Sequence, residues 1–306
     1  MTDQNKNLML RLVTAFLLLP LVLWLIALGG LWFALLIAVA AGLTALEVNQ
    51  MAAAAPSGAA TSTPPAASAS ASGAAAAAAP AGSSRLGAGA LASALVAFLI
   101  PLLNFLPQLS WLPLTLRSLL IALALIALVD ALFFEPEVAR APLRVAIALM
   151  APLYTGLTIA ALGPLRQLPE GGWWIVLTLS VTWLNDTGGY FAGRAFGKRK
   201  LYPRISPSKT WEGAVGGALA STLGAAAVKL LFLPALPLWG ALLIGAGGSI
   251  AGPLGDLSES MLKRGFAAKD SGKMLPGHGG LLDRIDALLF VAPFVLFCAR
   301  HLLAAQ

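Results

Sequence analysis

Side chains able to bind metals and phosphates concentrate in one segment, GDLSESMLKRGFAAKDSGKMLPGHGGLLDRID, which runs from Gly255 to Asp286. It carries four aspartates (Asp256, Asp270, Asp283 and Asp286) among five cations (Lys263, Arg264, Lys269, Lys273 and Arg284), and long apolar stretches flank it. Ionised groups beside a bilayer-length segment are costly, so their density favours a functional site. Because carboxylates bind Mg²⁺, and cations together with Mg²⁺ bind phosphates, the segment predicts phosphate chemistry.

Three of these aspartates are expected to lie close together. Asp283 and Asp286 are three residues apart, so a helix places them on one face. Two like charges at a membrane edge favour a cation beside them. Asp256 is expected to end one span and Asp283 to begin the next, which puts both carboxylates at one membrane depth. This spacing predicts a divalent metal shared by Asp256 and Asp283, with Asp286 bound to the metal or to one of its ligands. The alternative is that Asp283 caps its helix while its neighbours are solvated.

A second polar segment, NDTGGYFAGRAFGKRKLYPRISPSKTWEG, runs from Asn185 to Gly213. Asp186 falls near the end of an apolar stretch, where a buried carboxylate needs a cation or a metal. Ser206 or Ser208 is expected to cap the following helix, and Lys209 beside that helix start predicts an anion site. The spacing of a P-loop is absent, which argues against a P-loop ATPase. The alternative is that these basic residues only anchor the chain at the membrane surface.

The composition predicts an all-α, polytopic membrane protein. The 306 residues are 58% hydrophobic and 11% charged, whereas a soluble domain is about a quarter charged. Backbone groups in a bilayer must be satisfied internally, which favours helices. Nine stretches are long enough to span a bilayer: residues 10–28, 31–51, 87–106, 114–134, 144–163, 173–192, 213–233, 236–256 and 282–303.

Residues 52–84 divide the chain. They are almost wholly Ala, Ser, Pro, Gly and Thr, without charge, and predict a flexible low-complexity linker. The linker separates the first two spans, within residues 1–51, from spans three to nine, within residues 85–306. The catalytic site is expected within residues 183–286.

The charges indicate an orientation. With the N-terminus in the cytoplasm, nine crossings place all but four of the 20 lysines and arginines on the cytoplasmic side; the exceptions are Arg117, Arg166, Lys229 and Arg300. This asymmetry follows the positive-inside rule, so the pI of 9.9 does not indicate a nucleic-acid partner. The single cysteine excludes an intramolecular disulfide, and two histidines argue against a histidine metal cluster.

The segment from Ser260 to Asp286 resembles the signature of the phosphatidate cytidylyltransferase (CDP-diacylglycerol synthase) family. DTGGYFAGRAFGK, ISPSKTWEGA and Glu47 at the end of the second span also fit that family. The resemblance covers most of the chain except residues 52–84. Gly189 and Ser208 depart from the Ala and Lys expected there, and Val48 stands where an aromatic residue is usual.

The resemblance implies transfer of a cytidylyl group from CTP to phosphatidate, giving CDP-diacylglycerol and pyrophosphate for phospholipid biosynthesis. It implies Mg²⁺ and allows a second cation and a homodimer. It also implies a multi-pass protein of the inner (plasma) membrane with a cytoplasmic active site. The expected catalytic residues are Asp283, Asp256, Lys263, Arg264 and His278, with a structural role for His278 as the alternative. The residues expected to bind phosphates of CTP or lipid are Asp186, Ser206, Lys209, Thr210, Lys269 and Arg284.

Two other functions remain open at this point. One is a CTP-dependent enzyme acting on another membrane lipid, such as archaeol phosphate or a polyprenol. The other is a secondary transporter, which should show repeated broken helices around a midplane site. The sequence has no internal repeat and its charges gather at one face, which disfavours transport.

Overall fold

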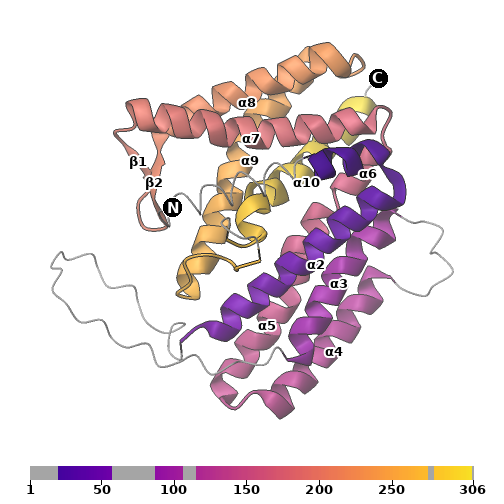
Figure 1. The fold of residues 1–306 in the computed structure, drawn as a ribbon, viewed down its shortest axis with the longest axis vertical. Helices are drawn as coiled ribbons and strands as arrows, with labels where there is room; N and C mark the ends of the chain where they lie inside the picture. Colours follow the sequence, from indigo (N-terminus) through magenta and orange to yellow (C-terminus); the bar gives the residue numbers. More distant parts are fainter. Residues whose placement is uncertain (1–19, 57–86, 106–114, 275–278, 305–306) are drawn as a thin grey trace, which may run out of the picture.

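The computed structural model describes residues 20–56, 87–105, 115–274 and 279–304. His278 and most of the expected linker, from residue 57, lie outside these ranges. Within them the chain is almost entirely helical (Figure 1), so the all-α membrane fold is confirmed. The exception is a two-stranded hairpin of β1 (Lys200–Tyr202) and β2 (Ser206–Thr210), which the sequence did not predict.

A helix over residues 20–28 precedes the main elements. These are α2 (Gly30–Ala54), α3 (Ala88–Phe105), α4 (Leu116–Phe134), α5 (Ala141–Ala151), α6 (Leu162–Gln167), α7 (Gly171–Phe196), α8 (Trp211–Phe232), α9 (Leu238–Gly265) and α10 (Leu282–Ala304). A 3₁₀ turn, η2 (Val138–Arg140), leads into α5, and a π-helical turn, η3 (Pro152–Leu157), follows it.

Six helical segments in the described part of the chain are long and apolar enough to span a membrane: α2, α4, the run Val138–Gln167, α8, α9 and α10. The expected span 87–106 corresponds to α3, whose apolar part is shorter than a bilayer span. The expected span 173–192 corresponds to α7, which is not among the six because it carries polar residues such as Asn185 and Asp186. The span 10–28 is only partly described. The count of about nine spans is therefore not confirmed.

One expected boundary is wrong. The span placed at 236–256 continues as α9 to Gly265, so Asp256 lies inside a helix rather than at its end. The extra turns carry Glu259 and Lys263, an i,i+4 ion pair of the kind that supports a helix beyond its apolar section. The extension matters because it moves Lys263 from a loop onto the same helix as Asp256.

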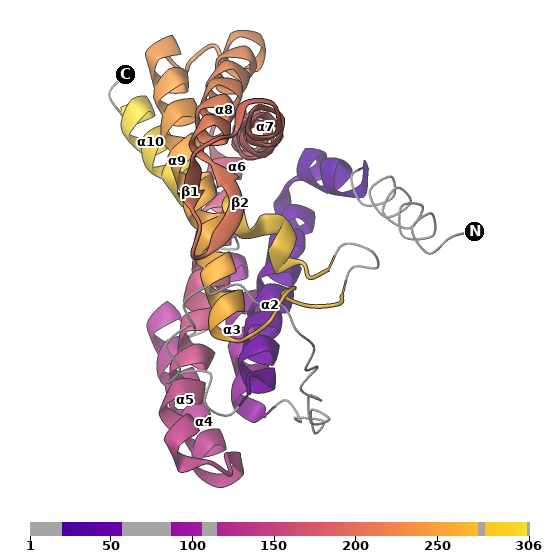
Figure 2. The same cartoon turned by 90° about the vertical axis from the view of Figure 1, so that its left-hand side faces the viewer.

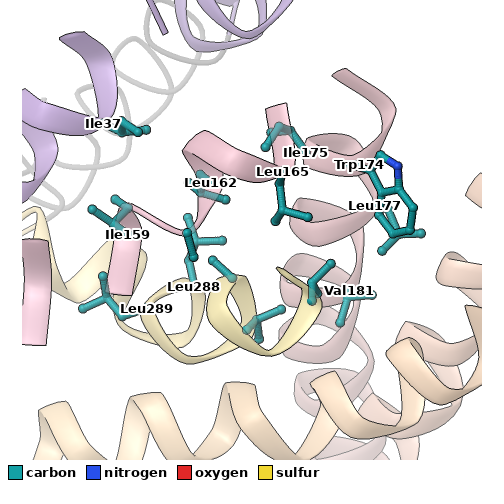
Figure 3. Packing of buried hydrophobic residues seen from close by; sticks show 14 of the residues in the cluster. Ile37, Ile159, Leu162, Leu165, Trp174, Ile175, Leu177, Val181, Leu288 and Leu289 are labelled. Carbon is teal, nitrogen blue, oxygen red and sulfur yellow. The ribbon is translucent and has the colours of Figure 1, made fainter. Parts of the chain in front are cut away.

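The helices form two groups. Helices α2 to α5 lie at one end of the molecule and α7 to α10 at the other, as Figure 2 shows. The core that joins them contains Ile37 of α2, Leu162 and Leu165 of α6, Trp174 of α7 and Leu289 of α10 (Figure 3). Each of these side chains is at least 95% buried. A continuous apolar core thus connects α2 with α7, which begins the second polar segment, and with α10, which carries the end of the first.

Glycines allow α7 and α8 to pack closely. A Cβ atom on Gly216 would lie 2.2 Å from the Cβ of Ala192, and one on Gly188 would lie 2.6 Å from that of Ala220. Small residues let helix backbones approach in this way in membrane proteins. The close crossing holds Asp186 of α7 near the hairpin that leads into α8.

A buried ion pair holds the ends of α3, α4 and α5. Asp130 is 3% exposed; it binds Arg144 at 2.9 Å and accepts a hydrogen bond from the Ala88 backbone N–H at 2.8 Å. Because removing one partner of a buried pair leaves an uncompensated charge, we expect Asp130→Ala to destabilise the protein by about 3 kcal/mol. Thermal unfolding in detergent measures this. Glu135→Ala, which removes the other partner of Arg144, should cost clearly less, and equal effects would contradict the assignment.

Candidate active site

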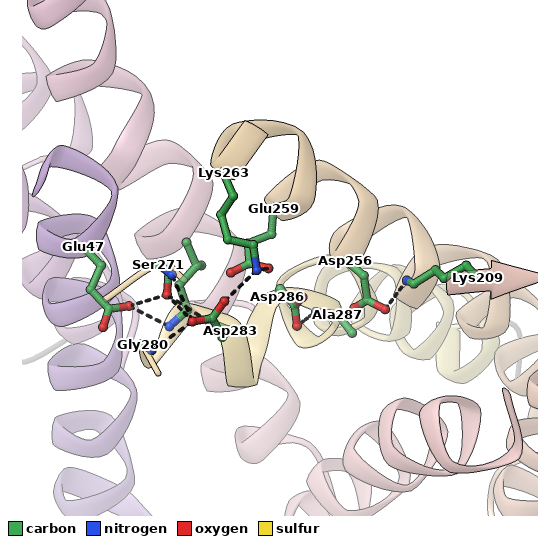
Figure 4. A network of polar contacts seen from close by, with 11 residues as sticks. Glu47, Lys209, Asp256, Glu259, Lys263, Ser271, Gly280, Asp283, Asp286 and Ala287 are labelled. Carbon is green, nitrogen blue, oxygen red and sulfur yellow. Dashed lines mark hydrogen bonds and ion pairs between the residues drawn. The ribbon is translucent and has the colours of Figure 1, made fainter. Parts of the chain in front are cut away.

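A row of charged side chains runs from α2 at one end, past α10 and α9, to β2 at the other end (Figure 4). It runs from Glu47 through Asp283 and Lys263 to Asp286, Asp256 and Lys209. The row unites the two polar segments of the sequence, which are separated by α8 and most of α9.

Asp283 occupies the first turn of α10 and has partners at both carboxylate oxygens. Oδ1 binds Lys263 Nζ at 2.6 Å. Oδ2 accepts hydrogen bonds from the backbone N–H groups of Ser271 (3.0 Å) and Gly280 (2.9 Å) and lies 2.9 Å from Ser271 Oγ. Gly280 precedes α10, so its bond ties the preceding loop to the first turn of the helix while Asp283 faces the polar row.

Lys263 lies between two carboxylates, because its Nζ also binds Glu259 Oε2 at 2.6 Å. Glu259 is 2% exposed, and its Oε1 is buried without a hydrogen-bond partner among the described residues. Glu259 was missed as a site residue. The sequence feature that could have identified it is its position four residues before Lys263. That spacing brings the two side chains together only if the helix continues beyond Asp256. A buried carboxylate oxygen without a partner has capacity for a cation or a water.

Asp256 pairs with Lys209, which β2 carries at the end of the hairpin. Sequence reasoning placed the cap of α8 at Ser206 or Ser208, and this is wrong: Ser206 pairs with Tyr202 in the hairpin, and Thr210 Oγ1 accepts the hydrogen bond from Gly213 N–H at 3.1 Å. Because β2 uses Ser206 and Ser208 as strand residues, the helix begins two residues later. The hairpin thereby fixes Lys209 beside α9.

A cavity of about 540 Å³ opens beside this pair. It is bounded by α7, β2, α8 and α9, and its polar lining comprises Asn185, Asp186, Tyr190, Arg194, Ser208, Lys209, Thr210 and Asp256. This size is typical of small-molecule sites. Both signs of charge line it, so the cavity is suited to a phosphorylated ligand together with a cation.

Of the other residues expected in the site, one lies in the polar row, three are exposed, and one is not described. Asp286 lies in the row between Asp283 and Asp256 (Figure 4), and one of its oxygens is 2.9 Å from the Ala287 N–H. Arg264, Lys269 and Arg284 are exposed. His278 is outside the described residues, so its role stays a prediction.

The shared metal also stays a prediction. Asp256 and Asp283 are paired with different lysines, Lys209 and Lys263. Within the described ranges, no three acidic, histidine or cysteine side chains are grouped closely enough to hold a metal by themselves. A metal held by these carboxylates would therefore need further ligands, such as phosphate oxygens of a substrate.

The family model described as the cytidylyltransferase family matches residues 9–302, nearly the whole chain. The chain belongs to this family. Its signature segment forms the end of α9, the following loop and the start of α10, which are the elements that carry Lys263 and Asp283.

Several curated relatives of this chain bear the name phosphatidate cytidylyltransferase. That of Bacillus subtilis is 44% identical over 149 residues, which are 48% of this chain and 55% of the relative. That of Staphylococcus saprophyticus is 45% identical over 150 residues, 49% and 57% of the two chains. That of Brucella suis is 47% identical over 140 residues, 45% and 52%. The chain thus spans about half the length of the curated relatives it matches.

Proposed function

We propose that the protein transfers the cytidylyl group of CTP to phosphatidate, which yields CDP-diacylglycerol and pyrophosphate. The observation that carries the proposal is the polar row of Figure 4, in which Lys209 pairs with Asp256 at the wall of the cavity and Lys263 pairs with Asp283, in an otherwise apolar helical fold. The relatives named phosphatidate cytidylyltransferase support the same substrates.

In the reaction, a lipid phosphate oxygen attacks the α-phosphorus of CTP and pyrophosphate leaves. The attacking phosphate is already ionised at neutral pH, so the site needs no strong base. Catalysis then consists mainly of positioning the reactants and neutralising spread negative charge. Lys209 and Lys263, each now paired with a carboxylate, would hold phosphates, and the cavity beside Lys209 would hold the nucleotide.

The carboxylates of the row fit Mg²⁺. This ion is usually held by one or two carboxylates together with substrate phosphates. The buried Oε1 of Glu259 has no hydrogen-bond partner in the described part of the chain, which supports capacity for a cation nearby. We propose that Asp256 and Asp283 hold Mg²⁺ together with substrate phosphates, that Asp286 binds the ion directly or through one of its ligands, and that the row has room for a second cation. When bound, Mg²⁺ would neutralise charge on the triphosphate and the leaving pyrophosphate.

The direct test is formation of CDP-lipid and pyrophosphate by the purified protein in nanodiscs, given [α-³²P]CTP and Mg²⁺. Phosphatidate, archaeol phosphate and a polyprenol should be compared at equal mole fraction. We expect a labelled lipid only with phosphatidate. Product with another lipid alone would replace the substrate assignment, and no product with any lipid would overturn the proposed function.

We further propose that the chain spans the inner membrane nine times, with its N-terminus and active site in the cytoplasm. We also propose that the protein forms a homodimer. The asymmetry of lysines and arginines supports the orientation, and the six apolar helices support the multi-pass arrangement. The mass of the protein in nanodiscs tests the dimer.

The orientation gives a labelling prediction. In a variant with Cys298 replaced, a cysteine at Ser72 should be protected from an impermeant thiol reagent in intact cells, because residue 72 is expected in the cytoplasm. A cysteine at Gln306 should be labelled, since nine crossings place that residue on the other side. Lysed cells, in which both should react, are the control. The reverse pattern in intact cells would overturn the nine-span orientation.

A further inference from the structure

Glu47 makes a contact between distant parts of the fold that the reaction scheme above does not use. It lies near the end of α2 and is 1% exposed. Its Oε1 accepts a hydrogen bond from the Leu281 N–H at 2.8 Å, and its Oε2 accepts one from the Leu282 N–H at 2.8 Å. The two partners are more than 230 residues away in the sequence.

The contact provides hydrogen-bond acceptors for backbone N–H groups at the start of α10. The first N–H groups of a helix have no partner inside the helix, and the N-terminal end of the helix dipole attracts negative charge. The side chain of Asp283 is already engaged by Gly280, Ser271 and Lys263. A carboxylate from α2 therefore supplies the hydrogen-bond acceptors and a further negative charge at the start of α10.

Ser271 links Glu47 to Asp283. Its hydroxyl oxygen lies 3.2 Å from Glu47 Oε2 and 2.9 Å from Asp283 Oδ2, and the Asp283 N–H lies 3.3 Å from it. A serine hydroxyl has one proton to donate. The two carboxylates therefore share one donor, so a change at Glu47 alters the hydrogen bonding of Asp283.

The surroundings leave little freedom for this arrangement. A Cβ atom on Gly272 would lie 2.6 Å from Glu47 Oε1, and one on Gly280 would lie 1.9 Å from Ser271 Oγ. The two glycines let the loop close around the carboxylate. Glu47 is thus enclosed by the loop and by the start of α10.

We propose that Glu47 is a positioning residue that fixes the start of α10 and, through Ser271, the carboxylate of Asp283. The effect on turnover rests on the proposed function, whereas the effect on the start of α10 does not. The proposal makes α2, outside both polar segments, a part of the active-site machinery.

The test compares Glu47→Gln with Glu47→Asp and with Asn49→Ala. Gln keeps the size but removes the charge and replaces one acceptor with a donor, so one of the two backbone N–H groups loses its partner. Asn49 is the matched control, since it is buried on the same helix but bonds Ser93 and the Ala45 carbonyl instead.

For Glu47→Gln we expect kcat to fall about 10- to 100-fold, as for other residues that orient a ligand-binding group. The KM for CTP should change by less than about threefold, because the substitution does not touch the nucleotide cavity. Glu47→Asp, which keeps the charge, should recover part of kcat. Backbone hydrogen exchange over residues 279–284 should be faster in Glu47→Gln and unchanged in Asn49→Ala.

Two results would overturn the proposal. One is exchange over residues 279–284 that is equal in Glu47→Gln and the parent protein. The other is a loss of kcat that matches the loss of folded protein and is equal in Asn49→Ala. If the parent protein makes no CDP-lipid, the proposed function fails, and the exchange measurement alone decides on the positioning role.

Discussion

Replacing Asp283 with asparagine is expected to lower Mg²⁺-dependent formation of CDP-lipid about a thousandfold, equivalent to roughly 4 kcal/mol of barrier. Asparagine keeps the size of the side chain but loses the charge that pairs with Lys263 at 2.6 Å. Its NH₂ group also replaces one of the two carboxylate oxygens, so either Lys263 or the backbone N–H groups of Ser271 and Gly280 lose their acceptor. Both losses act at the carboxylate proposed to hold the metal.

The measurement is the initial rate of the purified variant at saturating CTP over a range of Mg²⁺ concentrations. Asp270→Asn is the control, because Asp270 is exposed in the same loop and should keep most of the rate. If Asp283→Asn keeps more than about a tenth of the parent rate with the same Mg²⁺ dependence, Asp283 is not a metal ligand.

The pair formed by Asp256 and Lys209 should be equally sensitive. We expect Asp256→Asn to remove nearly all turnover, about a thousandfold, and Lys209→Met to lower kcat/KM for CTP about a hundredfold. Asp256 contributes a charge toward the proposed metal, while Lys209 faces the cavity proposed for the nucleotide. Lys200→Gln, on the exposed start of the same hairpin, should have little effect.

The double variant Asp256→Asn/Lys209→Met separates catalysis from structure. If both residues act on substrate or metal, the double variant should be at least as impaired as the worse single variant. If the two groups only neutralise each other, removing both should restore stability and most of the activity, since no unpaired charge remains. That recovery would remove both residues from the active site.

The sequence by itself determined the membrane class, the family and the polar segments that carry the chemistry. These features are local: hydropathy sets the helices, and a carboxylate or lysine beside a span is conspicuous wherever it occurs. The placement of Asp283 and Asp286 in the first turns of one helix also follows from spacing alone.

Tertiary structure decided which of these groups meet. The pairing of Lys263 with Asp283 required α9 to continue past Asp256, and the pairing of Lys209 with Asp256 required a hairpin that ends at Thr210. The contact of Glu47 with the start of α10 depends on how α2 packs against the helices that follow it in the chain. Such contacts are set by the crossing of packed helices, and helix crossings depend on side chains from many elements at once, so no spacing within one segment encodes them.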